Sequence, residues 1–220
     1  LNGWQSYNSW NNTIGLGSSN YFRPTENLQL VANFYYGKDS RSNVKRFHHD
    51  NSIVGRIVNR PAGTGLSQAA FSLNTHYGFQ NGAGVSSGVN YMTGASLASR
   101  FWFKRNKFAL TFRRDFVTNP GLYLAFTPSP VTPNDFTDAI STDPKQKLTI
   151  YQATSTLDLM PNDHFTFRLE YGYRKSNVPY FAGAGGTTSP DGWADTPISN
   201  WRPDLRQTEN RLTVAFNFRL

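Results

Sequence analysis

Hydrophobic and polar residues alternate strictly over the last ten positions of the chain. The apolar set is Leu212, Val214, Phe216, Phe218 and Leu220, and the other set is Arg211, Thr213, Ala215, Asn217 and Arg219. Because successive side chains of a strand point to opposite sides, this pattern predicts a strand with one apolar and one polar face. The pattern recurs along the chain in segments long enough to cross a bilayer, which takes roughly 9–11 residues for a tilted strand.

Turn-forming residues separate these segments into successive hairpins. The expected strands cover residues 13–22, 28–36, 52–59, 69–79, 86–103, 108–113, 148–159, 165–173 and about 207–220. The links between them are short at 23–27, 104–107 and 160–164, medium at 60–68 and 80–85, and long at 38–51, 118–146 and 175–206. Short turns alternating with long loops are typical of bacterial outer-membrane barrels, whose short turns face the periplasm.

We therefore predict an all-β fold, a transmembrane antiparallel up-and-down β-barrel with about nine to ten strands in this chain, and a single domain over residues 1–220. The first expected strand starts on the outer side, whereas single-chain barrels usually have an even number of strands and both ends in the periplasm. An open sheet would also leave unpaired edges in lipid. We expect this sequence to be the C-terminal part of a larger barrel, or to be completed by another chain.

The composition agrees with a two-faced sheet. Aromatic residues make up 15% of the chain, yet its mean hydropathy is −0.53, and its apolar runs are too short for a transmembrane helix. The chain has no cysteine, which excludes disulfides, thiolate metal sites and cysteine catalysis. Its net charge of +8 is spread over strands and turns rather than gathered in one run, so we do not expect nucleic acid as a partner.

Charged residues recur on the predicted polar faces. The candidates to line a lumen are Arg100, Arg113, Arg168, Glu170, Arg174, Arg211 and Arg219. An arginine-rich wall would favour anionic solutes, whereas arginines and acids paired across strands would stiffen the barrel. Both interpretations stay open, and since consecutive residues cannot both face inward, Arg114 is expected on the side opposite Arg113.

Two long loops are candidates to narrow such a lumen or to bind ligands. In loop 175–206 the candidates are the aromatic residues Tyr180, Phe181, Trp193 and Trp201. Loop 118–146 carries Asp135, Asp138 and Asp143, which could bind Ca²⁺ or bridge to lipopolysaccharide. A solvated loop is the simpler interpretation of these acids.

The residues that could carry catalysis or hold a metal give no recognisable site. His48 and His49 are expected in a polar loop beside Asp50, and neighbouring residues on an extended backbone point apart, which makes joint metal ligation awkward. His76 is expected on the polar face with Ser72, but a polar lumen wall accounts for both. No nucleophile elbow, zinc-protease motif or phosphate-binding loop is present. We therefore predict no enzymatic activity, no metal and no cofactor.

Several strand sequences resemble those of the OmpL-like β-barrel porin family. They are Leu1-Asn-Gly-Trp-Gln5, residues 13–24, Phe34-Tyr-Tyr-Gly-Lys38, Phe167-Arg-Leu-Glu-Tyr-Gly-Tyr-Arg174 and Ser176-Asn-Val-Pro-Tyr-Phe181. The resemblance implies a channel of the Gram-negative bacterial outer membrane, and carries no catalytic residue across.

The sequence thus predicts a porin for passive diffusion of small hydrophilic solutes, with a leaning towards anions. The alternatives are a non-conducting barrel that anchors a larger complex, an outer-membrane hydrolase and a soluble sugar-binding β-protein. The partners implied by the first two interpretations are outer-membrane lipid and lipopolysaccharide, with a homo-oligomer or a larger membrane complex left open.

Overall fold

The computed structural model describes residues 13–38, 43–82, 84, 86–88, 90–120, 123, 148–186 and 204–219. Nine strands form one antiparallel sheet in which neighbours in sequence are neighbours in space, in the order β1-β2-β3-β4-β5-β6-β7-β8-β11. Their bounds are β1 Leu16–Thr25, β2 Leu28–Lys38, β3 Lys45–Asn59, β4 Leu66–Asn81, β5 Tyr91–Phe103, β6 Phe108–Thr118, β7 Thr149–Asn162, β8 Phe165–Ser176 and β11 Thr208–Phe218. This is the all-β, up-and-down architecture predicted from the alternation. No helix among the described residues is long and apolar enough to cross a membrane.

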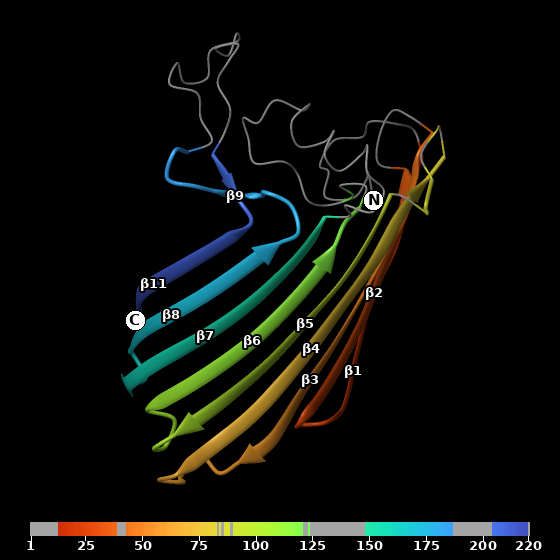
Figure 1. Cartoon of the computed structure of the whole chain (residues 1–220). Helices are drawn as coiled ribbons and strands as arrows, with labels where there is room; N and C mark the ends of the chain where they lie inside the picture. The colour runs from red at the N-terminus through yellow and green to blue at the C-terminus, as the bar shows by residue number, and fades with distance from the viewer. Residues whose placement is uncertain are drawn as a thin grey trace.

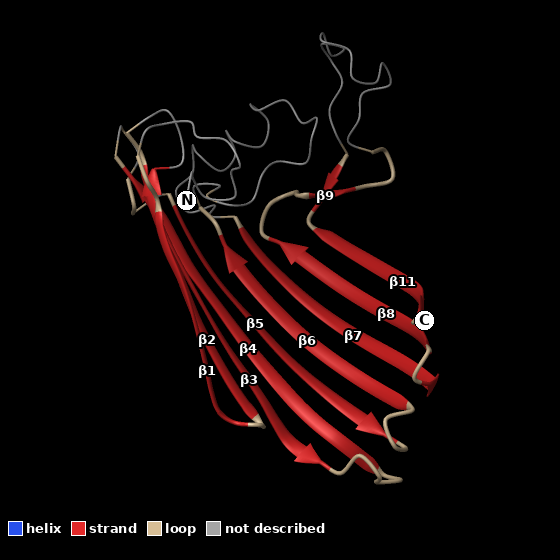
Figure 2. Ribbon diagram, turned by 180° about the vertical axis from the view of Figure 1, so that it is seen from behind, coloured by secondary structure: helices blue, strands red, loops and turns tan. Residues whose placement is uncertain are grey.

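The sheet is tilted, twisted and curved, with the tight turns gathered at one end of the strands and the longer links at the other (Figure 1). β1 and β11 lie at opposite edges and do not pair with each other, so the sheet is open within the described residues. The medium link at 60–65 falls at the turn end, and the link between β4 and β5 falls at the loop end, as Figure 2 shows from behind. We use "turn end" and "loop end" for these two ends below.

The two faces of the sheet differ sharply in exposure. On β11, Leu212, Phe216 and Phe218 are 68%, 68% and 78% exposed. On the other face, Asp158 and Thr156 of β7 are almost completely buried. Side chains converge on the concave face of a curved sheet and diverge on the convex face, so the polar face is the concave one. An apolar convex face and a polar concave face are the arrangement of a membrane barrel with a wet interior.

A small hydrophobic cluster lies at the loop end of β7 and β8. Leu148 and Val178 are buried at its centre, and Ile150, Tyr180 and Leu205 pack around them. Beside it, two short strands, β9 Phe181–Ala182 and β10 Leu205–Arg206, pair antiparallel. This two-stranded sheet, which the sequence pattern did not predict, fixes both ends of the link between β8 and β11.

The prediction of a polar loop over residues 38–51 was wrong. β3 begins at Lys45 and pairs with β2 residue by residue from Lys38↔Lys45 to Leu28↔Gly55, so His48, His49 and Asp50 belong to a strand. The reason is that both faces of β3 are polar between His48 and Ser52, and the alternation that marks the other strands vanishes there. The pairing of its backbone with both neighbours, β2 and β4, stabilises the strand instead.

Other strand bounds also differ from the predicted ones, most of all at the start of β5 and the end of β6. β5 starts at Tyr91 rather than near residue 86, because Ser86 and Asn90 close a turn in which the Asn90 N–H donates to the Ser86 carbonyl. β6 continues beyond Arg113 to Thr118, and pairs with β7 over that whole length. The extension places Arg114 within a strand.

Candidate functional site

The strand register brings six of the seven predicted lumen-lining residues onto the concave face. They are Arg100, Arg113, Arg168, Glu170, Arg174 and Arg211, and we call this polar concave face the inner wall. Arg113 lies in the same cross-strand row as Arg211, through Thr154 and Gly172. Arg219, the seventh, lies just past the end of β11, where its N–H donates to the His164 carbonyl at 2.9 Å. That the inner wall lines a lumen stays a prediction.

Asp158 is the centre of the charged cluster at the turn end of the inner wall. Its side chain is 0% exposed and accepts hydrogen bonds from two arginines on different strands. Arg168 on β8 donates from Nε at 2.7 Å and from Nη2 at 3.1 Å, and Arg100 on β5 donates from Nη1 at 2.5 Å. The Arg100 guanidinium also lies over the Trp102 ring, 4.9 Å from its centroid. One carboxylate thus joins three strands, β5, β7 and β8, and the prediction from sequence did not include it.

Further towards the loop end the charges pair locally. Arg113 donates to Asp115 at 2.9 Å on the same strand, and Arg174 of β8 pairs with Glu209 of β11. Glu170 accepts a hydrogen bond from the Thr156 hydroxyl at 2.8 Å. Most arginines of the wall thus have a hydrogen-bonded or ion-paired partner, and whether the wall favours anions or stiffens the barrel stays a prediction.

The charge balance of the inner wall is positive. Among residues with an assigned strand register, its basic members are Arg46, Arg56, Arg100, Arg113, Arg168, Arg174 and Arg211, and its acidic members are Asp50, Asp115, Asp158, Glu170 and Glu209. Within the described chain Arg211 is in no ion pair, and it lines an open pocket of about 170 Å³ with Arg113, Glu170 and Arg174. A mobile anion would meet a concentration of arginines in this pocket.

Tyr123, in the link that follows β6, lies on the inner wall. Tyr123 is 3% exposed and lies against β3, where its hydroxyl donates to the Phe47 carbonyl at 3.0 Å and its ring stacks on His48 at 5.9 Å. Arg46 also contacts Tyr123. Its guanidinium lies 4.2 Å from the centroid of the tyrosine ring, and its Nη1 donates a hydrogen bond to the Tyr123 carbonyl. β5 and β4 separate β6 from β3 in the sheet, so Tyr123 contacts a strand that is not a neighbour of β6.

Comparison with known families identifies the fold. The family described as "Putative beta-barrel porin-2, OmpL-like" matches residues 1–220, the whole chain. The chain belongs to this porin family. The resemblance predicted from its strand sequences is therefore confirmed. No curated protein and no solved structure gave a match.

The loop aromatics predicted to narrow the porin fall into two groups. Tyr180 and Phe181 contact each other edge to face at 5.4 Å at the root of the loop, and Arg174 lies 5.2 Å from the centroid of Phe181. They pack into and beside the hydrophobic cluster above β7 and β8. Trp193 and Trp201 lie outside the described residues, as do Asp135, Asp138 and Asp143 of the other long loop. A constriction formed by these aromatics stays a prediction.

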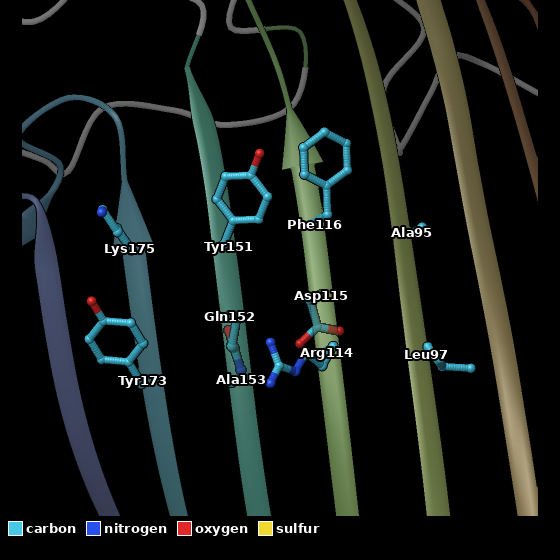
Figure 3. Close-up of a pocket in the computed structure, with 10 residues that line it drawn as sticks. All are labelled: Ala95, Leu97, Arg114, Asp115, Phe116, Tyr151, Gln152, Ala153, Tyr173 and Lys175. Atoms are coloured by element: carbon cyan, nitrogen blue, oxygen red, sulfur yellow. The ribbon is translucent and has the colours of Figure 1, made fainter.

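The convex face of this porin-family sheet carries its own shallow groove, of about 370 Å³ (Figure 3). Phe116, Tyr151 and Tyr173 stand on three neighbouring strands around the small residues Ala95 and Ala153. Arg114 and Lys175 add two positive charges at its margin. Arg114 thus lies on the face opposite Arg113, as predicted, and aromatic rings beside cations are what a membrane interface favours.

His48 and His49 lie in a strand rather than in the predicted loop, whereas His76 lies on the polar face of the sheet, as predicted. His49 faces the convex side and contacts the Asn33 carbonyl at 3.0 Å, whereas His48, Asp50 and His76 meet on the inner wall. Ser72 and His76 share that wall but are four positions apart on β4, which corresponds to about 13 Å along a strand. This separation excludes a direct serine–histidine hydrogen bond.

Proposed function

We propose that this chain forms part of the wall of an outer-membrane channel through which small hydrophilic solutes diffuse passively, with a preference for anions. Membership of a β-barrel porin family supports the channel. The observation that carries the proposal is the separation of the two faces, apolar and exposed on the convex side and polar and charged on the concave side. Placing arginines on the lipid side near the bilayer midplane would cost roughly 2–4 kcal/mol each, so this sheet has one favourable orientation in a membrane.

The anion preference follows from the composition of the inner wall. Its seven arginines outnumber its five acids, so the wall carries a net positive charge that attracts anions beyond the range of the individual ion pairs. Passive selectivity of this kind needs no covalent chemistry, only the width and the wall charge of the passage. In a closed barrel the free edges of β1 and β11 would be paired by further strands, because lipid cannot satisfy their backbone groups.

Location and partners follow from the same arrangement. The convex face would contact the acyl chains of the outer membrane, and Arg114 and Lys175 would lie where anionic lipid or lipopolysaccharide headgroups can reach them. The aromatic residues around them have the composition of an interfacial girdle.

Conductance in a planar lipid bilayer tests the proposal. The intact protein is purified in detergent from its membrane, inserted into the bilayer and studied under a salt gradient. Stable single-channel steps with a reversal potential towards that of the anion are the expected result. A cation-selective pore would overturn the charge argument and keep the channel, whereas a folded barrel without conductance would overturn the channel.

A non-conducting barrel that anchors a larger complex is the second candidate, and one observation favours it. The link after β6 turns inward and holds Tyr123 against β3, which places protein within the space that solutes would cross. If the barrel is silent while folded, co-purification of a stable partner from cross-linked membranes is the measurement that separates anchoring from a closed channel.

A further inference from the structure

Three potential metal ligands meet on the inner wall near the loop end. His48 and Asp50 are two positions apart on β3 and therefore point to the same face, and His76 lies opposite Asp50 on β4. One ligand atom from each residue lies within 4.8 Å of the other two. His48 is 2% exposed, and the two imidazole rings are 5.8 Å apart.

Hydrogen bonds fix which nitrogen of His48 carries the proton. The Tyr123 hydroxyl donates its hydrogen to the Phe47 carbonyl at 3.0 Å. Since that hydrogen is used, the contact of 3.2 Å between Tyr123 Oη and His48 Nδ1 requires the imidazole to be the donor. His48 is therefore protonated on Nδ1 and has its lone pair on Nε2. Histidines that bind metals typically donate a hydrogen bond from the ring nitrogen that is not the ligand, and this bond sets the tautomer.

Asp50 is held in a similar way from the other side. The Asn33 amide on β2 donates to Asp50 Oδ1 at 2.8 Å, and strand pairing places Asn33 directly opposite Asp50. This bond orients the carboxylate and leaves Oδ2 as an oxygen that can face the two imidazoles. Tyr123 and Asn33 thus hold two of the three side chains, His48 and Asp50, in place.

We propose that His48, Asp50 and His76 bind one divalent first-row transition metal ion of the Zn²⁺ class. Two imidazole nitrogens and one carboxylate suit Zn²⁺ and its neighbours, whereas Ca²⁺ and Mg²⁺ prefer oxygen ligands alone. In a tetrahedral site with bonds of about 2.1 Å the ligand atoms are about 3.4 Å apart. The three ligand atoms lie within 4.8 Å of one another here, so small side-chain rotations would bring them to the distances of such a site.

Local charge sets a limit on the affinity. Asp50 supplies one negative charge, which attracts a cation. Arg46 lies on the same part of the wall, in contact with the ring and the carbonyl of Tyr123, and its positive charge opposes cation binding. His49 faces the opposite side of the sheet, where its Nδ1 contacts the Asn33 carbonyl. The proposal concerns binding alone and does not depend on whether the barrel conducts.

Metal titration of the intact, detergent-solubilised protein tests the site. Zn²⁺ is added in competition with a coloured chelator, and Co²⁺ replaces it to give a visible spectrum that reports coordination. The variants are His76→Gln, which removes a ligand, and Asp50→Asn, which keeps the side-chain shape. His49→Gln, on the other face of the same strand, and His164→Gln, at the turn end, are the matched controls.

The expected result is one saturable Zn²⁺ per chain and a tetrahedral Co²⁺ spectrum. His76→Gln and Asp50→Asn should each weaken Zn²⁺ binding by roughly 100-fold, which is as large as the largest loss expected when a residue that only supports a ligand is removed. The controls should bind Zn²⁺ like the parent. Heat-dependent mobility on gels shows which variants remain folded. Absence of saturable binding in the parent, or equal binding in the folded Asp50→Asn variant and the controls, would overturn the proposal.

Discussion

Gly78 lies directly beneath the phenol ring of Tyr123. A Cβ at position 78 would come 2.5 Å from Oη of Tyr123 and 2.6 Å from Nδ1 of His48. The chain beyond β6 can therefore rest on the inner wall only because β4 has no side chain at this point. A glycine inside a strand often marks such a close approach of another segment.

Replacing Gly78 with alanine should push Tyr123 off the wall. We expect the folded state to lose about 1–3 kcal/mol, as overpacked sites do, and the single-channel conductance to rise. Gly172→Ala is the control, because its Cβ would lie 3.9 Å from the Thr154 hydroxyl, an ordinary contact on the same wall. An unchanged conductance in Gly78→Ala would show that Tyr123 does not narrow the passage.

Asp158→Asn should destabilise the sheet, because Arg100 and Arg168 lose the carboxylate that holds them. Both arginines remain partly exposed, so water limits the loss of unfolding free energy to about 1–3 kcal/mol. Asp115→Asn removes a half-exposed partner of Arg113, and its effect should stay below about 1 kcal/mol. Urea unfolding in detergent, followed by tryptophan fluorescence, measures both. Equal midpoints for the two variants would mean that the three-strand cluster adds no more than a surface pair.

Arg211 and Arg114 offer a test of the wall charge. Arg211 faces the inner-wall pocket, whereas Arg114 lies at the convex groove. Arg211→Gln should lower the anion-to-cation permeability ratio by roughly twofold in dilute salt, since one unit charge contributes below about 1 kcal/mol in water-like surroundings. Reversal potentials under a salt gradient give the ratio. Arg114→Gln should leave it unchanged, and an equal shift in both variants would contradict the assignment of the two faces.

The base of the loop between β8 and β11 should respond to acid through Asp204. Its carboxylate accepts the Gly185 N–H at 3.0 Å and pairs with Arg206 at 2.8 Å. The hydrogen bond from the Gly185 N–H, then that from Arg206, holds the pKa of Asp204 below its usual range. A depressed pKa means that this stabilisation is present above the ordinary aspartate pKa of about 3.9 and is lost as the pH falls through the lower, folded-state value.

Hydrogen exchange of peptides covering residues 181–186 and 204–207 measures this effect. At neutral pH, Asp204→Asn should exchange faster than the parent, after correction for intrinsic rates. The difference should shrink once the pH falls below about 4 and the parent carboxylate takes up a proton. A difference that is as large at pH 3 as at pH 7 would show that the Asp204 charge does not stabilise this hairpin.

The sequence predicted the fold well wherever one face of a strand is apolar. β8 and β11 alternate between apolar and polar residues from Phe165 to Tyr173 and from Leu212 to Phe218, and the structure pairs these segments from Phe165↔Phe218 to Tyr171↔Leu212. The part of β3 from Lys45 to Asn51 could not be found in the same way, because His49 and Asn51 make its convex face as polar as its concave face near the loop end. Its partners on β2 and β4 determine that it is a strand, and such partners are not visible in a local pattern.

For the candidate site, too, the local pattern predicted the face on which a residue lies but not the residues that it contacts from other strands. Alternation gave the face on which Arg100 and Arg168 lie, but not that both meet Asp158, which is 58 residues from Arg100. The meeting of His48, Asp50 and His76 depended equally on the register of two strands. Gly78, near the loop end of β4, is the one local sequence signal of the close approach of Tyr123.

The mixture of paired and unpaired charge on the inner wall has a consequence for the water in which the protein works. Electrostatic attraction extends about 10 Å at 0.1 M ionic strength but only about 3 Å at 1 M. In dilute water the excess arginines would act across much of a narrow passage, and the wall would sort solutes by sign. In brine the same residues would act only on solutes that touch them, and size would become the main criterion for entry.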